Sequence, residues 1–355
     1  MQRIIQLFWI WIAMSVFSEG VTVLAGEKFP PRTIPEGQGA ADRFLKLIDR
    51  TRVPLQSELI EIEAAAGIRR FRFSFYSESG VRVPGILVRP IADGNRPLVI
   101  SLHGTGSNKE SQRPFLERLA RLGFVGISID GRHFGERMPM GGGGNQAYES
   151  AILSTWRTGI GFPFLYDTVW DVLRLLDYVE TLNGVDTVRI GLTGISKGGM
   201  ETYLASAVDK RIAVAIPFIG VQSFSWALEH GAWQSRIGTI QNAVNAAADD
   251  VSAPLNAAFV RRFYARVVPG IDGPFDGPSL LPLIAPRPLL VINGDSDERT
   301  PLAGVQICAA AAADAYSAAA ALNRFELLIQ PRTGHAIQPV SEQRAIDWFV
   351  KWLRP

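Results

Sequence analysis

The feature that most constrains this chain is a six-residue segment, Gly194-Ile195-Ser196-Lys197-Gly198-Gly199. It lies between an apolar run, residues 188–193, and a helix-compatible run, residues 200–207. A strand, Gly-x-Ser-x-Gly and a helix in this order are typical of a sharp turn that holds a serine at its tip. Glycine relieves the crowding of such a turn because it has no Cβ. The helix directs its N-terminus at the serine, where it stabilises negative charge. The segment therefore predicts that Ser196 is a nucleophile.

A serine hydroxyl is a weak nucleophile and needs a base, usually a histidine that a carboxylate orients. The chain has four histidines, and His335 follows a strand-like run, residues 324–330. In open α/β sheets, catalytic groups gather on loops at the carboxyl ends of strands. We therefore expect His335 to be the base.

Two aspartates compete for the acid position, Asp295 and Asp297, in the loop that follows the apolar residues 288–293. Asp297 lies three residues after the glycine of this loop, the spacing of the acid loop in α/β-hydrolases. Asp295 is expected to brace the turn, which is the usual role of a loop aspartate. We predict Asp297 as the acid, because the order Ser196, Asp297, His335 is then the α/β-hydrolase order.

An oxyanion hole in this kind of site needs two backbone N–H groups, one from the residue after the serine and one from an early loop. Lys197 supplies the first. We assign the second to Thr105, with Gly104 as the alternative, in the loop after the strand-like residues 97–102. His103 is expected to orient this loop and not to be the base, since it comes too early in the chain. The Lys197 side chain is expected to be solvated.

The fold class predicted is α/β, an α/β-hydrolase fold with a mostly parallel central sheet and helices on both faces. Short apolar strands alternate with amphipathic helices, which is the pattern of a parallel sheet covered on both sides. Residues 71–76 and 81–88 flank a Ser-Gly turn and predict an N-terminal antiparallel hairpin. Helices are expected over residues 112–122, 165–182, 309–321 and 342–353.

The domain organisation predicted has three parts. Residues 1–25 have a basic start, an apolar stretch and small residues at the end, and they predict a signal peptide, hence a secreted or periplasmic protein. An uncleaved membrane anchor is the alternative. Residues 26–69 are expected to form a linker and N-terminal extension, and residues 70–355 the catalytic domain. Two segments, at about 131–164 and 221–283, are longer than connectors need to be, and we expect helical insertions over the active site.

Composition excludes several classes of function. The formal net charge of +2 gives no electrostatic case for nucleic acid. The one cysteine, Cys308, allows no intrachain disulfide and is expected to be a small buried apolar residue. The histidine spacing suggests no zinc site, and the chemistry predicted needs no cofactor. The expected partner is a small-molecule ester, with no stable membrane span in the mature chain; the sequence does not fix the oligomeric state.

A family resemblance rests on the motifs around the serine. They are residues 171–177, 185–191, 194–199, 209–211 and 216–218. With these motifs, residues 167–224 resemble the acetyl xylan esterase and cephalosporin-C deacetylase group of α/β-hydrolases. More loosely, the chain is similar to dienelactone hydrolases and to the catalytic domain of prolyl oligopeptidases. The chain departs from the first group after the nucleophile, where that group has glutamine and this chain has Lys197. The resemblance implies the triad Ser196, Asp297 and His335.

The function predicted is hydrolysis of carboxylic esters, with acetyl or other short acyl groups, through an acyl-enzyme intermediate. One alternative is a peptidase of the prolyl oligopeptidase type, which the short N-terminal extension disfavours because it has no room for a propeller domain. The other alternative is a non-catalytic binding protein on the same scaffold. Retention of all three triad residues argues against it.

Overall fold

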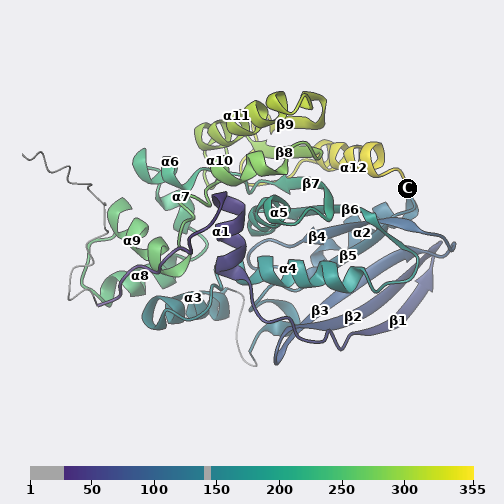
Figure 1. The fold of residues 1–355 in the computed structure, drawn as a ribbon, viewed down its shortest axis with the longest axis horizontal. Coiled ribbons are helices and arrows are strands. Elements are labelled where there is room, and N and C mark those ends of the chain that lie inside the picture. The colour runs from purple at the N-terminus through teal and green to yellow at the C-terminus, as the bar shows by residue number, and fades with distance from the viewer. Residues whose placement is uncertain (1–27, 140–144) are drawn as a thin grey trace, which may run out of the picture.

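The computed structural model describes residues 28–139 and 145–355. Its centre is a nine-stranded mixed sheet with the order β1-β2-β3-β5-β4-β6-β7-β8-β9 (Figure 1). Strands β1 to β3 pair antiparallel, β3 pairs antiparallel with β5, and the remaining pairs are parallel. The strands are β1 (Glu58–Ala65), β2 (Ile68–Glu78), β3 (Val81–Pro90), β4 (Arg96–Leu102), β5 (Val125–Ile129), β6 (Val185–Ile195), β7 (Ile212–Phe218), β8 (Leu289–Gly294) and β9 (Phe325–Gln330). The mostly parallel sheet confirms the predicted fold class.

The predicted N-terminal hairpin is β2 and β3, joined at Gly80, whose φ of 74° suits a tight turn. In β2 the apolar residues alternate, so that Phe71, Phe73 and Phe75 share one face. The rings of Phe73 and Phe75 stack on Tyr178, with centroids 4.9 and 5.7 Å away. The hairpin is therefore fixed to the helix that carries Tyr178.

Helices cover both faces of the sheet, as predicted. One face packs against α4 (Tyr166–Val179), α5 (Lys197–Val208) and α11 (Leu302–Ala318), and it includes the buried Cys308. The other packs against α2 (Arg113–Arg121) and α12 (Pro339–Leu353). Four of these helices, α2, α4, α11 and α12, overlap the four ranges expected from sequence. The two apolar layers hold the strands, and thereby the loops at their carboxyl ends, in fixed positions.

The N-terminal extension differs from the prediction, which starts the catalytic domain at residue 70. Helix α1 (Gly39–Ile48) buries Phe44 and Ile48 completely in the main core. The Phe44 ring lies 4.8 Å from the ring of Tyr166 on α4, and β1 pairs with β2 as the edge of the sheet. The layers of this domain therefore begin well before residue 70. The predicted signal peptide, residues 1–25, lies outside the described residues.

The two long insertions contribute helices that pack together at one end of the molecule, on the left in Figure 1. They are α3 (Gln146–Thr158), α6 (Phe224–Glu229), α7 (Gln234–Ile237), α8 (Gln241–Asp249) and α9 (Ala257–Val267). The second insertion also contains α10 (Gly277–Leu280), which packs against α11. Trp156 of α3 stacks on Phe263 of α9, with ring centroids 5.7 Å apart. The Gly-rich tract, residues 141–144, is outside the described residues. The insertions thus form one helical layer beside the sheet.

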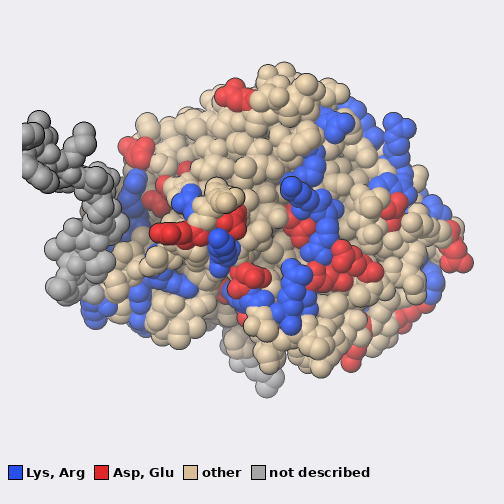
Figure 2. All heavy atoms as spheres, viewed as in Figure 1, with Lys and Arg blue, Asp and Glu red and all other residues tan. Residues whose placement is uncertain are grey.

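Charged side chains are mixed on the face drawn in Figure 2, with blue and red atoms interspersed and an almost uncharged area over α11. Helix α11 carries one charged residue, Asp314, in a run rich in alanine. Within residues 28–139 and 145–355, no helix combines the length and apolar character needed to cross a membrane.

Candidate active site

Ser196 lies between β6 and α5, at the turn predicted from sequence. Its φ of 56° and ψ of −111° are unusual for a residue with a side chain, and strain of this kind concentrates at functional sites. The Ser196 N–H donates to the carbonyl oxygen of Phe218 at 2.9 Å, which holds the turn against β7. A Cβ at Gly198 would lie 2.5 Å from the carbonyl oxygen of Leu102. Only glycine fits there, and this explains the sequence pattern.

A continuous hydrogen-bond chain joins Ser196, His335 and Asp297. The Ser196 hydroxyl lies 2.8 Å from His335 Nε2, and His335 Nδ1 lies 2.7 Å from Asp297 Oδ2. His335 stands on the loop after β9 and Asp297 on the loop after β8, so both reach the serine from carboxyl ends of parallel strands. The carboxylate accepts from Nδ1–H, which leaves Nε2 free to accept the hydroxyl proton.

Asp297 is fixed on all sides. Its carboxylate is fully buried; Oδ1 accepts from the Arg299 N–H at 2.8 Å, and Oδ2 accepts from the Thr300 hydroxyl at 2.7 Å. Burial on its own raises the pKa of Asp297, but the hydrogen bonds from His335 and Thr300 outweigh burial and hold the pKa below its usual range. The carboxylate is therefore ionised at neutral pH, as an orienting group must be.

Asp295 takes the bracing position instead. Its oxygens accept from the N–H groups of Arg332 at 2.7 Å and Thr333 at 3.0 Å, both on the loop that carries His335. Of the two candidate aspartates, Asp297 is the one that contacts His335, while Asp295 ties the acid loop to the histidine loop.

The early loop passes directly over the serine. A Cβ at Gly104 would lie 3.6 Å from Ser196 Cβ, and Thr105 lines the same hollow as Ser196 and His335. Lys197 is the first residue of α5, so its N–H lies at the helix N-terminus beside the serine. The two predicted donors, Lys197 and Thr105, thus lie on segments that border Ser196.

His103 holds this loop in place. Its Nε2 accepts from the Gly131 N–H at 2.9 Å, and its Nδ1 lies 2.8 Å from the Gly104 carbonyl oxygen. Since a carbonyl only accepts and an N–H only donates, the ring is neutral with its proton on Nδ1. Burial, helped by the nearby Lys197 charge, lowers the pKa of His103 to about 4. Among the described residues, no hydrogen bond joins the ring to Ser196 or His335, and this position matches the expected loop-orienting role.

The side chain of Lys197 corrects one expectation. It is not solvated: it is 2% exposed and forms an ion pair with the equally buried Glu201, one helical turn along α5. Its Nζ also lies 5.5 Å from the ring of Phe134 and 5.8 Å from that of Tyr148. Lys197 and Glu201 stand four residues apart in the sequence, a spacing that indicates an ion pair on a helix. The aromatic residues that bury this pair come from a distant part of the chain, so the local sequence does not reveal the burial.

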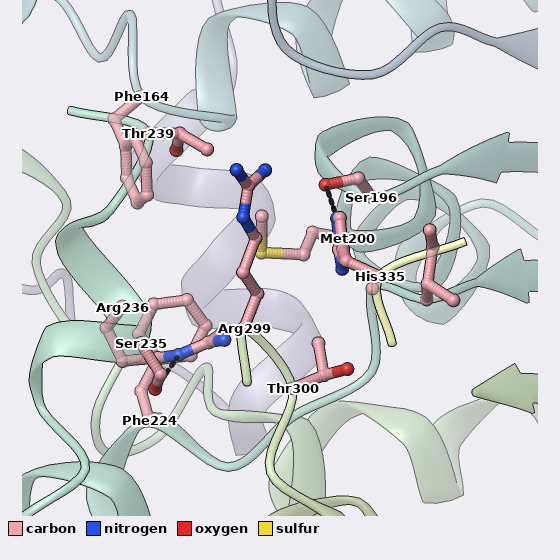
Figure 3. Close-up of a pocket in the computed structure, with 12 residues that line it drawn as sticks. Phe164, Ser196, Met200, Phe224, Ser235, Arg236, Thr239, Arg299, Thr300 and His335 are labelled. Atoms are coloured by element: carbon pink, nitrogen blue, oxygen red, sulfur yellow. Dashed lines mark hydrogen bonds between the residues drawn. The ribbon is translucent and has the colours of Figure 1, made fainter. Parts of the chain in front are cut away.

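A pocket opens beside Ser196, and residues of both insertions form part of its wall (Figure 3). It has about 370 Å³ of empty space, part of it open to solvent. It is lined by Phe164, Ser196, Met200, Ile219, Gly220, Phe224, Ser235, Arg236, Thr239, Arg299, Thr300 and His335. The two arginines of this lining, Arg236 and Arg299, were not predicted as site residues from the sequence. Arg299 could have been found from its place two residues after Asp297, whereas nothing local distinguishes Arg236. Within the described ranges, no three His, Cys, Asp or Glu side chains cluster as a metal site would require.

The sheet, the strained serine turn and the hydrogen-bonded Ser-His-Asp set define the class: a serine hydrolase with the α/β-hydrolase fold. The chain belongs to the acetyl xylan esterase (AXE1) family, whose model matches residues 43–230, more than half of the 355 residues. A second family model, glucuronyl esterase of fungi, matches residues 162–320. The chain is thus a carboxylic ester hydrolase.

Individual proteins show the same relationship. The putative hydrolase YtaP of Bacillus subtilis (strain 168) is 23% identical over 286 residues, covering 77% of this chain and 84% of that protein. A 4-O-methyl-glucuronoyl methylesterase of Hypocrea jecorina (strain QM6a) is 31% identical over 195 residues, covering 51% of this chain and 39% of that protein. The chain therefore matches less than half the length of that methylesterase. The solved acetyl xylan esterase from Paenibacillus sp. R4 superposes with a TM-score of 0.66 at 20% identity, covering 91% and 97% of the two chains; this likeness concerns the fold.

Proposed function

We propose that Ser196, His335 and Asp297 are the catalytic triad of this ester hydrolase. The observation that carries the proposal is the unbroken hydrogen-bond chain from the Ser196 hydroxyl through the imidazole to a buried carboxylate. In the first step, His335 Nε2 takes the hydroxyl proton as Ser196 Oγ attacks the ester carbonyl. Asp297 remains ionised and keeps the imidazole in the required tautomer.

The tetrahedral oxyanion is stabilised by the backbone N–H groups of Lys197 and Thr105. The protonated His335 then gives its proton to the leaving alcohol, and the acyl group stays on Ser196. Water enters, His335 deprotonates it, and the same steps in reverse order release the carboxylic acid. The partner of the site is a small-molecule ester.

The acyl group proposed is short, acetyl or similar. Membership of the acetyl xylan esterase family supports this, as does the pocket, whose wall opposite Ser196 includes the insertion residues Phe164 and Phe224. A long acyl chain would have to displace these rings, and Phe224 is almost fully buried.

The test is hydrolysis of a series of p-nitrophenyl esters from acetyl to palmitoyl, with Ser196→Ala as the control. We expect kcat/KM to be highest between acetyl and butyryl and to vanish in Ser196→Ala, while thermal unfolding shows that the variant is folded. Serine-independent hydrolysis, or none by folded protein, would contradict the proposal.

We also propose that residues 1–25 act as a signal peptide, so that the enzyme works outside the cytoplasm. The basic start and the apolar stretch of the sequence support this. Expression of the full chain in a bacterial host, followed by fractionation and N-terminal sequencing, tests it. A periplasmic product starting near residue 26 is expected. A full-length product in the membrane fraction would indicate an anchor instead.

A further inference from the structure

Arg236, on α7, is a buried arginine without a carboxylate partner. The residue is 7% exposed; its Nε donates to the Ser235 hydroxyl at 3.1 Å, and its guanidinium carbon lies 5.2 Å from the Phe224 ring. Among the described residues, no Asp or Glu oxygen lies within 4 Å of it. Burial lowers the pKa of Arg236, so the fold holds this charge at a cost.

Five other arginines of the described chain that are buried or half-buried show how unusual this is. Each contacts carboxylates or main-chain carbonyl oxygens: Arg132 and Arg137 at Asp171, Arg174 at Asp177 and Val53, Arg266 at Pro30 and Trp156, and Arg287 at Asp209 and Ile212. The two carboxylates whose charge acts on Arg236, Asp276 and Asp297, are occupied elsewhere. Asp276 accepts from the N–H groups of the helix α6 start, and Asp297 holds His335. Arg236 therefore lacks a partner that its environment would favour.

Arg299 supplies a second positive charge to the same pocket. It lines both hollows that flank Ser196, and Figure 3 shows its guanidinium in the space between Thr239 and Ser196. Its N–H donates to Asp297 at 2.8 Å, so its backbone is fixed relative to the triad. Within the part of the chain described, Arg299 forms no ion pair. The side chain is exposed and free to meet a ligand.

The pocket thus has two guanidinium groups and no acidic residue in its described lining. A concave site lined by one sign of charge, with walls of low dielectric, concentrates ligands of the opposite sign. A guanidinium presents N–H donors in a planar fork that matches a carboxylate, and such charge-assisted pairs are among the stronger hydrogen bonds.

We infer that this pocket selects esters that carry a separate carboxylate, which Arg299 binds beside Ser196 while Arg236 adds a second positive charge to the wall of the pocket. The inference rests on the proposed function of Ser196 and deepens it. The carboxylate takes no part in bond making; it fixes the ester relative to the nucleophile. The carboxylate belongs either to the acid half of the ester, as in a monoester of a dicarboxylic acid, or to the alcohol half, as in an acylated hydroxy acid.

Two pairs of matched probes test this, with hydrolysis followed by pH-stat titration at pH 7.5. Monomethyl glutarate and its amide place the charge on the acid half; 3-acetoxypropanoate and its amide place it on the alcohol half. Each pair differs in charge and hardly in size. We expect kcat/KM for the charged member of one pair to be roughly 10- to 100-fold higher, the range for hydrogen bonds to charged groups. The difference should lie mainly in KM.

Variants connect the preference to the two arginines. Arg299→Gln and Arg236→Gln are each expected to lower the ratio of charged to neutral kcat/KM by about tenfold or more, while Arg299→Lys keeps most of it. Arg261→Gln is the matched control, because Arg261 is an exposed arginine of α9 that does not line the pocket. If Arg236→Gln does not fold, the exposed Arg299→Gln decides the matter.

The outcomes separate the inference from the proposed function. Serine-dependent hydrolysis without a charge preference in either pair would overturn the inference and leave the triad standing. A preference unchanged in both glutamine variants would also overturn it, and would make Arg236 a structural residue that stacks on Phe224. Absence of any serine-dependent ester hydrolysis would overturn the proposed function and the inference with it.

Discussion

Replacement of Asp297 by asparagine tests the assignment of the acid at atomic detail. In the wild type, Asp297 Oδ1 accepts from the Arg299 N–H at 2.8 Å and Oδ2 accepts from His335 at 2.7 Å. An asparagine has one oxygen and one NH2 group. If its oxygen stays with the fixed main-chain donor, the NH2 group faces His335 Nδ1. That nitrogen must then accept, so the ring proton moves to Nε2, which faces the serine and no longer works as a base.

The size of the effect follows from this change of tautomer. An equivalent change in a Ser-His-Asp triad lowers kcat by roughly 10⁴-fold, which is about 5.4 kcal/mol of barrier. The matched control is Asp295→Asn. Asp295 accepts from the N–H groups of Arg332 and Thr333, and asparagine keeps one of these bonds. We expect at most about a tenfold loss in kcat, since a single lost hydrogen bond amounts to roughly 1 kcal/mol.

The assay is kcat for p-nitrophenyl butyrate in the wild type and the two variants, with thermal unfolding to show that each is folded. The expected ratio of the two losses is on the order of 10³. Equal losses, or a larger loss in Asp295→Asn, would refute the assignment of Asp297 and the tautomer argument with it.

Three further predictions concern the surroundings of the triad. Gly198→Ala places a Cβ 2.5 Å from the Leu102 carbonyl oxygen, so kcat/KM should fall by about 100-fold or more as the serine shifts; wild-type activity would contradict the geometry. Lys197→Met leaves Glu201 buried and unpaired, so the free energy of unfolding measured in urea should fall by about 3–5 kcal/mol. The double variant Lys197→Met, Glu201→Leu should recover part of this loss. An unchanged free energy of unfolding in the single variant would refute the buried pair. The pKa of Asp297 is lower in the folded state, so this carboxylate stabilises the fold above roughly pH 4, and the stabilisation disappears as the pH falls through the folded-state pKa. The urea midpoint of the wild type should therefore exceed that of Asp297→Asn at pH 6 and approach it at pH 2; a gap that widens in acid would contradict the sign.

The parts of the fold predicted from sequence are those with a local cause. The serine turn needs glycines at fixed positions, so its pattern survives in the sequence. Buried strands such as β4 are mostly apolar, and β2 alternates apolar residues with period two. These signals depend on neighbours within a few residues, and pattern analysis detects them.

The parts that differ depend on distant contacts. Strand β1 is an edge strand on which Leu59, Ile60 and Ile62 are all exposed, so its alternation does not report a buried face. The burial of Lys197 depends on Phe134 and Tyr148, about 60 and 50 residues earlier in the chain. Arg236 acquires its position only when the second insertion folds beside Ser196. Periodicity carries no information on such contacts.

The central claim is that Ser196 is the nucleophile that His335 activates, and covalent labelling tests it most directly. The protein is incubated with a p-nitrophenyl alkylphosphonate, a phosphonylating analogue of the ester, and the adduct is located by peptide mass spectrometry. The account predicts one adduct per chain, on Ser196, formed with loss of esterase activity and greatly slowed in His335→Ala. An adduct on another residue, or full activity after Ser196 is labelled, would contradict it.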